Sequence, residues 1–531
     1  MKRFNTTGVC IPEKHYMVDL TDRVREIKKL VDDGKYFTII KARQYGKTTT
    51  LSALEKALCE EYDVISIDFQ DVTGIDFVDE YGFVRGLAGA LCDVVNGTAI
   101  SASEENATAL NKMAFQNDEA KLSDIFRILD SICKEAQRPV VLMIDEVDTA
   151  ANNQVFLDFL GKLRSGYIKR EKNPTHKTFQ SVILAGVTDV KHLKRKIRDE
   201  DQHKVNSPWN IAADFDIDMS LSEPGIKGML DEYESDHHTG MDTGEIAKQI
   251  RAYTSGYPYL VSRICQKIDE NLVPEVFGTL SEVWTVYGVD EAVKQIVSEE
   301  NTLFDSVMGK LINYPELKQQ LRRVLLRGET IAYVPDNEEQ KQLKMYGFIV
   351  NHQNSVAISN RIFEMRLYNY FIGESRANEE LKQSAAASRS IFVNQDGWLD
   401  VPKIMDHFIR EHNRIHGENT ERFVEAEGRE RFITYISGII NGTGTYSVEE
   451  QTRDQKRTDL VIHYHGRRYV IELKIWRGER YNADGEKQIL EYLDYFGLDT
   501  GYLLSFNFNQ KKTPGVERIQ IGGKTIFEGI V

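Results

Sequence analysis

The feature that most constrains this 531-residue chain is a Gly-Lys-Thr sequence placed between a predicted strand and a predicted helix. The β-rich run 36–40 precedes it, and leucines spaced for one helical face follow it. In this order the loop N–H groups and the helix N-terminus can face a phosphate, with Lys47 on the β and γ phosphates and Thr48 on a magnesium ion. The predicted nucleotide-binding residues of the loop are Gly46, Lys47, Thr48 and Thr49.

A second Gly-Lys-Thr, at residues 523–525, is predicted to be a turn. Gly522 and Gly523 stand between two β-type runs, which is typical of a two-residue hairpin, and no helix follows. Only the first copy is therefore expected to bind phosphate. That copy departs from the usual pattern, because Lys41 occupies the place of the first glycine. A partner motif is needed to support the interpretation.

The partner motif is the apolar run 140–144, which is followed directly by Asp145 and Glu146. A continuous apolar run is typical of a parallel strand that is buried on both faces. In phosphoryl chemistry Asp145 would hold magnesium through water, and Glu146 would orient and activate the attacking water. The loop and this strand together predict nucleotide binding.

Two further patterns extend the interpretation. The apolar run 181–187 ends in Thr188 and Asp189, where such folds place a γ-phosphate sensor, and Ser-Gly-Tyr-Pro at 255–258 interrupts a helical region. With these motifs, residues 10–375 resemble the AAA-like ATPases close to the archaeal-ATPase and signal-transduction ATPase branch, whose lid carries a Gly-x-Pro motif. The resemblance implies a five-stranded parallel core, a helical lid and a winged helix, with ATP and Mg²⁺ as cofactors.

The pattern of residues 315–359 agrees with a winged helix. Residues 315–326 and 337–347 are predicted helices, and 348–359 is a predicted hairpin around Gln353 and Asn354. A winged helix can enter a DNA groove, but in ATPases of this type it commonly packs on the lid. We favour packing on the lid.

A second chemistry is indicated by RTDLVIHYHGRRYVIELKIW, residues 457–476. Two β-rich runs joined at His465 and Gly466 predict a hairpin, and alternation along the second run places Glu472 and Lys474 on one face. Asp459, at the head of the first run, can lie near that face. The two carboxylates can hold magnesium and a water aimed at a scissile phosphate, and the lysine can activate that water or stabilise the developing charge.

This spacing resembles the PD-(D/E)XK restriction-endonuclease-like pattern, with Thr458 in place of the proline. Gln488 and Tyr492, one turn apart on the next predicted helix, match the Gln-x-x-x-Tyr of the exonuclease-type branch of that superfamily. The upstream acidic residue of that branch would be Glu430 or Glu427, with Glu430 favoured, and Glu450 is another candidate. The fusion of this module to an AAA-like ATPase recurs in a large family of bacterial proteins, which the whole sequence resembles.

Charge and hydropathy limit the partners. A net charge of −15 argues against a surface that binds nucleic acid everywhere, so any such site must be local, as the basic excess over 451–480 would allow. No segment approaches the ~20 apolar residues of a membrane span, and the N-terminus has no apolar signal region. We expect a cytoplasmic protein without a membrane partner. The expected partners are ATP and nucleic acid, with DNA favoured, and homo-oligomerisation is left open.

The expected fold is a multidomain α/β chain. Its predicted parts are an ATPase core over 1–220, a lid over 221–298, a winged helix over 299–372, a linker over 373–390 and an α/β nuclease-like domain with a mixed sheet over 391–531. The predicted function is an ATP-binding and ATP-hydrolysing protein that controls a magnesium-dependent nuclease, in defence against foreign DNA or in mobile-element biology. The alternatives are an ATP-dependent signalling switch, or a DNA remodeller whose nuclease-like domain only binds.

Overall fold

A computed structural model describes most of the chain, and it separates into two compact units. The first unit contains residues up to 233 with 257–262 and 344–347, and the second contains 234–256, 263–343 and 348–531. The described residues are 2–72, 74–97, 103–116, 120–150, 153–173, 175–188, 194–196, 204–206, 208–273, 278–325, 330–374, 379–416, 425–440, 444–451, 457–475, 479–506 and 513–531.

The first unit is built on a parallel sheet with the strand order β3-β6-β5-β4. Its strands are β3 (Tyr36–Ile40), β4 (Asp63–Asp68), β5 (Val140–Asp145) and β6 (Ser181–Gly186). All three strand pairings are parallel, so the carboxyl ends of the strands meet at one edge. The parallel core that the sequence predicted is therefore present.

The resemblance implies a fifth strand in this sheet, and the structure corrects that expectation. The structure describes four strands in this sheet, and beside β3 only a single parallel bridge joins Phe37 to Ala213. Aspartate is disfavoured in strands, and Asp214, Asp216 and Asp218 follow the bridge at alternate positions. This acidic alternation accounts for a ladder that stops after one pair.

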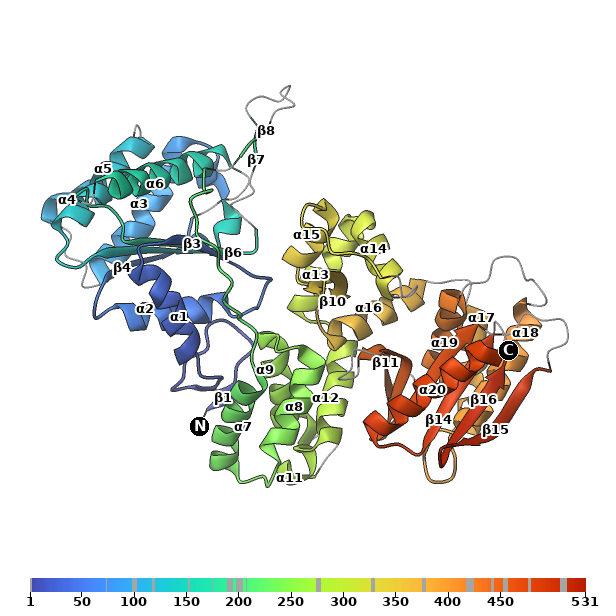
Figure 1. Cartoon of the computed structure of the whole chain (residues 1–531). Coiled ribbons are helices and arrows are strands. Elements are labelled where there is room, and N and C mark those ends of the chain that lie inside the picture. Colours follow the sequence, from blue (N-terminus) through green and yellow to red (C-terminus); the bar gives the residue numbers. More distant parts are fainter. Residues whose placement is uncertain are drawn as a thin grey trace. The chain divides into compact units, whose positions relative to one another are not determined.

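Helices cover both faces of this sheet (Figure 1). Alternate residues of a strand point to opposite faces of the sheet. Leu142 of β5 therefore packs in the apolar cluster with α3, α4, α5 and α6, and Met143 packs in the cluster with α1 and α2. These covering helices are α1 (Thr21–Asp32), α2 (Lys47–Leu58), α3 (Glu80–Gly97), α4 (Glu104–Phe115), α5 (Leu122–Glu135) and α6 (Gln154–Lys172), and α7 (Glu223–His237) follows later in the chain.

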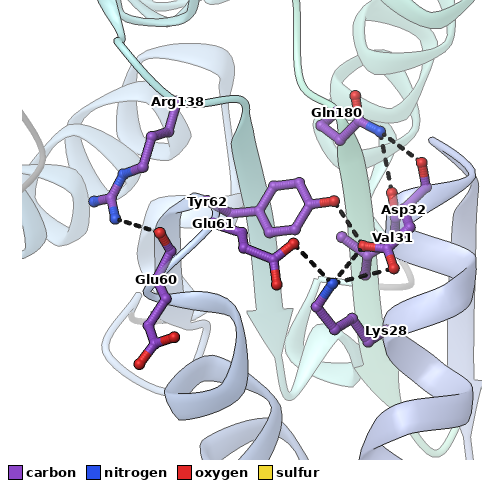
Figure 2. Close-up of polar contacts among 8 residues, drawn as sticks. All are labelled: Lys28, Val31, Asp32, Glu60, Glu61, Tyr62, Arg138 and Gln180. Carbon is purple, nitrogen blue, oxygen red and sulfur yellow. Dashed lines mark hydrogen bonds and ion pairs between the residues drawn. The ribbon is translucent and has the colours of Figure 1, made fainter.

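A polar network fixes the amino ends of the strands (Figure 2). Lys28 on α1 bonds the carboxylates of Asp32 (2.9 Å) and Glu61 (3.1 Å), and the hydroxyl of Tyr62 donates to Asp32 at 2.7 Å. Gln180, directly before β6, donates to the backbone carbonyl of Asp32 at 3.2 Å. These contacts tie the end of α1 to the starts of β4 and β6, at the edge opposite the Gly-Lys-Thr loop.

Short elements complete the first unit. The strands β1 (Arg3–Phe4) and β2 (His15–Tyr16) pair in parallel, and β7 (Lys194–Lys196) pairs antiparallel with β8 (Lys204–Asn206). Single 3₁₀ turns lie at η1 (Gly74–Phe77) and η2 (Val147–Thr149).

Helices make up the sequence between the parallel sheet and the C-terminal sheet. They are α8 (Thr243–Thr254), α9 (Pro258–Gln266), a π-helical turn (Lys267–Leu272), α11 (Leu280–Val283), α12 (Val286–Ser298), α13 (Thr302–Asn313), α14 (Pro315–Leu325), α15 (Glu338–Met345) and α16 (Arg361–Glu374). Between α15 and α16 lies the hairpin of β9 (Ile349–His352) and β10 (Ser355–Ile358), and its turn residues Gln353 and Asn354 have positive φ, as the sequence predicted.

The C-terminal domain contains a six-stranded mixed sheet with the order β11-β12-β13-β14-β16-β15. Its strands are β11 (Gly444–Gln451), β12 (Arg457–Tyr464), β13 (Arg467–Ile475), β14 (Thr500–Phe506), β15 (Gly515–Ile521) and β16 (Lys524–Ile530). Its helices are α18 (Val401–His416), α19 (Glu425–Ile440) and α20 (Glu479–Phe496). Gly522 and Gly523 have φ values of 57° and 83° between β15 and β16, so the second Gly-Lys-Thr is a hairpin turn.

The predicted linker is corrected in part. Residues Glu379–Ala387 form helix α17, which packs against α18 and α19, and Ala385 is fully buried. A 3₁₀ turn follows at Arg389–Ile391. The alanine run explains the difference, because alanine has the highest helix propensity and small side chains allow close packing. Small side chains are typical of a linker, but they also suit a closely packed helix.

Candidate functional sites

The Gly-Lys-Thr loop joins β3 to α2 at the carboxyl edge of the parallel sheet. Gly46 precedes α2 with φ of 79°, a left-handed conformation that favours glycine. Lys47 is 5% exposed, and its ammonium donates to the carbonyl oxygens of Lys41 and Ala42, each at 3.3 Å. The Lys47 ammonium is therefore held by uncharged backbone carbonyls of the loop itself.

The structure shows how the loop tolerates Lys41 at the glycine position. The N–H of Lys41 donates to the carbonyl of Gly186 at 3.1 Å, which continues the β3–β6 pairing by one residue. The left-handed conformations of the loop occur later, at Gln44 (φ 55°) and Gly46. Because the backbone at Lys41 is not left-handed, a side chain is accommodated there without strain.

The predicted carboxylates lie beside the loop. The hydroxyl of Thr48 donates to Asp145 at 2.7 Å, and the backbone N–H of Glu146 donates to the other oxygen of Asp145 at 2.9 Å. Burial raises the pKa of Glu146, while the nearby Lys47 ammonium lowers it. The structure thus brings Thr48, Asp145 and Glu146 together at the end of β5.

These donors fit a magnesium ion that is shared with a substrate. Among the described residues no group of three His, Cys, Asp or Glu is arranged to hold a metal alone. Mg²⁺ in phosphate sites keeps several waters and takes only one or two protein ligands along with phosphate oxygens. One hydroxyl and one carboxylate, from Thr48 and Asp145, meet that requirement.

Sequence reasoning missed Asp148, which binds the backbone directly after β6. Its carboxylate accepts from the backbone N–H groups of Val187 (2.7 Å) and Thr188. Gly186 permits this approach, since a Cβ there would lie 2.9 Å from Val147 and 3.2 Å from the Asp148 carboxylate. The signal was the third acid in Asp-Glu-Val-Asp. Thr188 is thus tied to the end of β5, and Asp189 lies outside the described residues.

A second missed acid is Asp68, the last residue of β4. It lies in register with Asp145 on the neighbouring strand, and burial, followed by the negative charge of Asp145, raises its pKa. Position was the available signal, because parallel strands place their last residues side by side.

The lid motif touches the loop from the other side. The hydroxyl of Tyr257 donates to the carbonyl of Arg43, and its ring packs edge-on against Tyr45 at 4.8 Å between centroids. A Cβ on Gly46 would lie 3.8 Å from Pro258. The Gly-Tyr-Pro sequence therefore supports the position of the loop.

A cavity of about 940 Å³ opens beside α2. Thr49, Ser52 and Ala53 form one wall, and Cys10 and Met229 belong to the segments that face them. The backbone N–H of Cys10 donates to the hydroxyl of Thr49 at 3.2 Å, so the cavity begins where the loop ends. Its volume lies in the range of small-molecule sites.

The predicted hairpin of the C-terminal domain is present. The β12–β13 register pairs Leu460 with Ile471, and the turn residues His465 and Gly466 have positive φ. The sequence predicts that Asp459, the residue before Leu460, lies near Glu472. The side chain of Asp459 itself lies outside the described residues.

Glu472 and Lys474 form an ion pair on one face of β13. The Lys474 ammonium lies 3.0 Å from the Glu472 carboxylate, and the two side chains are 17% and 1% exposed. The alternation inferred from the sequence thus produces a buried carboxylate with an ammonium alongside.

Helix α20 covers the same face. Tyr492 is fully buried in a cluster with Val461 and Val470, and Val470 shares its face of β13 with Glu472. Gln488 lies one turn before Tyr492 and is half-buried. The helix therefore brings Gln488 and Tyr492 to the face that carries the ion pair.

The upstream glutamate remains a prediction. Glu430 on α19 accepts from the guanidinium of Arg322 on α14 at 3.2 Å. The side chains of Glu427 and Glu450 lie outside the described residues. The contact with Arg322 could not be found from sequence, because it joins positions more than a hundred residues apart.

Two family models match the chain. A model described as an AAA-like domain matches residues 13–372, and one described as the PD-(D/E)XK nuclease superfamily matches residues 445–519. No curated protein matches. No helix in the described ranges combines the length and the apolar character needed to cross a membrane.

Several solved structures are similar to this chain at low sequence identity. A Walker-type ATPase of Pyrococcus abyssi is 13% identical, with 68% of this chain and 99% of that chain covered and a TM-score of 0.46. The ORC1 protein of Aeropyrum pernix in complex with DNA is 10% identical, with coverages of 66% and 93% and a TM-score of 0.31. The RuvB Holliday junction branch migration motor of Thermotoga maritima is 13% identical, with coverages of 64% and 92% and a TM-score of 0.32.

Proposed function

We propose that nucleotide in the ATPase core controls metal-dependent cleavage of nucleic acid. The chain belongs to the AAA-like family and carries a C-terminal PD-(D/E)XK nuclease domain. The observation that carries the proposal is the buried Glu472–Lys474 pair, on the face of β13 that α20 covers. A buried carboxylate beside an ammonium on one strand has the composition that phosphodiester hydrolysis needs.

At the ATPase site, each side chain has a role that its contacts support. Lys47 would leave the neutral carbonyls of the loop and donate to the β and γ phosphates. Thr48 and Asp145 would hold Mg²⁺, which neutralises charge on the phosphates. Glu146 would orient the attacking water, and Asp148 would keep Thr188 facing the γ phosphate.

The cavity beside α2 would take the base and ribose of the nucleotide. Thr49 links it to the loop, so a nucleotide with phosphates at Lys47 would extend along the first turns of α2. The apolar part of its lining, which includes Ala53 and Met229, suits a planar base.

At the nuclease site, Glu472 and Asp459 would hold the metal. The metal would supply a bound water that is readily deprotonated, and its positive charge would offset negative charge on the scissile phosphate. Lys474 would donate to the developing negative charge. Gln488 and Tyr492 would position these groups from α20, and Glu430, Glu427 or Glu450 would add an acid from upstream.

The finer assignments rest on the resemblance. We propose that α13, α14, α15 and the β9–β10 hairpin form the winged helix, supported by the helix and hairpin order. We further propose that Mg²⁺ is the metal, that DNA is the target, and that the setting is cytoplasmic defence against foreign DNA or mobile-element biology. The residue boundaries predicted for the ATPase core, the lid, the winged helix and the nuclease-like domain belong to the same proposal.

A cleavage assay with and without ATP tests the control. Purified protein is incubated with Mg²⁺ and a panel of single-stranded and duplex DNA and RNA, and Lys47→Ala is run in parallel. The expected result is cleavage whose rate changes with ATP in the wild type and is insensitive to ATP in Lys47→Ala. An identical ATP response in both proteins would remove the phosphate loop from the control of cleavage.

A further inference from the structure

A second pocket, of about 600 Å³, lies in the second unit at the amino end of β13. Lys474 lies six positions after Arg468 along that strand, which corresponds to about 20 Å at roughly 3.3 Å per residue. The pocket is therefore distinct from the nuclease face described above. Its volume is in the range of small-molecule sites, and nothing in the proposed mechanism uses it.

Two arginines in this pocket are held by aromatic rings. The Arg467 guanidinium carbon lies 3.8 Å from the centroid of the Trp398 ring, and that of Arg468 lies 4.6 Å from the centroid of Phe496. Arg467 is exposed. Stacking occupies one face of each guanidinium, so the edges that carry the N–H donors remain available to a ligand.

The donors of these arginines are uncommitted within the described part of the chain. No carboxylate among the described residues pairs with Arg467 or Arg468, and the buried Nε of Arg468 has no hydrogen-bond acceptor there. Buried polar groups in native proteins are normally satisfied. A phosphate, which accepts from guanidinium edges in a bidentate manner, would satisfy them.

Trp398 is fixed in place by its own loop. The side-chain oxygen of Asn394 accepts from the backbone N–H of Trp398 at 2.9 Å, and Val393 forms an antiparallel bridge with Leu399. The N–H of Leu399 donates to the hydroxyl of Tyr469 at 3.1 Å, which attaches the loop to β13. The backbone that carries Trp398 is therefore held in place, and a preorganised ring loses little entropy when a ligand binds.

The pocket also contains two acids, and they limit the ligand. Asp499 is exposed, while Asp290 already accepts from Gln249 at 2.8 Å and from the hydroxyl of Tyr253 at 2.9 Å. Two arginines and two aspartates leave the pocket close to neutral. This balance favours one phosphate with an aromatic group over a duplex with many phosphates, in agreement with the net charge of −15.

We propose that this pocket binds single-stranded nucleic acid, with one unstacked base on the Arg467–Trp398 platform and its phosphate at the edges of Arg467 and Arg468. Single strands are recognised by stacking on aromatic rings and arginine planes combined with backbone neutralisation. The inference rests on the proposed nuclease function, because the strand gripped here is the strand that the Glu472 face would cleave.

The test is binding of a fluorescently labelled 20-nucleotide single-stranded DNA to the full chain without divalent metal, so that the DNA stays intact. Arg467→Gln and Arg467→Ala/Arg468→Ala are compared with Arg518→Ala, an exposed arginine on β15 of the same sheet. We expect the double variant to bind at least tenfold more weakly, with a salt slope smaller by about 0.7, since the two arginines share one single-strand phosphate contact and each such contact contributes about 0.7. Arg518→Ala should bind within twofold of the wild type.

Trp398→Ala separates stacking from charge. It should weaken binding severalfold while leaving the salt slope unchanged, because no phosphate contact is lost. Arg467 is exposed, so Arg467→Gln tests the site even where the double variant unfolds. Unchanged affinity in Arg467→Gln and Trp398→Ala would overturn the inference, and so would an equal loss of duplex and single-strand affinity in these variants.

Cleavage in Mg²⁺ distinguishes this inference from the proposed function. If the wild type cleaves and Arg467→Gln binds and cleaves normally, the proposal that the pocket binds single-stranded nucleic acid is wrong, and the proposed nuclease function is unaffected. A wild type that binds through these residues but does not cleave would support the pocket and refute the nuclease. A wild type that does not bind single-stranded DNA would overturn the pocket.

Discussion

The phosphate loop and the nuclease hairpin each place a lysine near carboxylates, but they hold that lysine differently. Lys47 donates to two neutral carbonyls, whereas Lys474 pairs directly with the carboxylate of Glu472. Neutral acceptors release an ammonium to an incoming phosphate without leaving a charge behind. A buried carboxylate that loses its ammonium needs another cation. The first site is thus prepared for an anion and the second for a metal.

The largest expected effect tests the ATPase side of this comparison. Glu146→Gln should slow ATP hydrolysis by about 10² to 10³, within the range that a positioned base contributes. The amide keeps the shape, so nucleotide affinity should change little. Phosphate release and binding of a fluorescent nucleotide measure the two effects. Normal hydrolysis would show that another group positions the water.

The contrast between the two lysines predicts that their removal changes the free energy of unfolding by unequal amounts. Lys474→Ala should destabilise the C-terminal domain by about 1 to 3 kcal/mol, because it leaves Glu472 buried without its ammonium. Lys47→Ala should change stability little, since only carbonyls lose a donor. Thermal unfolding measures both, with the exposed Lys403→Ala, which removes a surface pair with Asp400, as the matched control. Equal destabilisation by Lys47→Ala and Lys474→Ala would break the comparison.

A smaller effect is expected from Asp148. Replacement by alanine removes the acceptor of the Val187 and Thr188 N–H groups and releases the end of β6. Hydrolysis should fall about tenfold, equivalent to roughly 1.4 kcal/mol, while nucleotide affinity stays nearly constant. A fall in affinity with an unchanged catalytic rate would instead assign Asp148 to binding.

The smallest effect concerns pH. Glu146 must be ionised to orient water, and burial raises its pKa above the ordinary value of a glutamate. Hydrolysis should therefore decline as the pH falls through that raised pKa, at a higher pH than for an exposed glutamate. The residual hydrolysis of Glu146→Gln should lack this step. A profile of the catalytic rate against pH for both proteins is the measurement, and the same step in both would exclude Glu146 as its source.

Local patterns predicted the elements, and tertiary contacts explain most of what the sequence did not show. The strands at 36–40 and 140–145 and the hairpin turn at 465–466 follow from apolar runs and turn residues. The contact of Asp148 with β6 was not predictable, because its partners are about 40 residues away.

The partial correction of the predicted linker has the same origin. The alanines of α17 were interpreted as a linker, and their burial against α18 and α19 depends on helices elsewhere in the chain. The ion pair of Glu430 with Arg322 likewise joins segments that no local pattern connects. Periodicity predicts an element, but the partner of a charged side chain is decided by the fold.

The most direct measurement is metal-dependent cleavage by Asp459→Ala and Lys474→Ala, with ATP hydrolysis of the same preparations as the control for an intact ATPase core. Both variants are predicted to lose cleavage and to hydrolyse ATP at the wild-type rate. Cleavage that persists in both would contradict the account, because the hairpin face would then not be where the phosphodiester is broken.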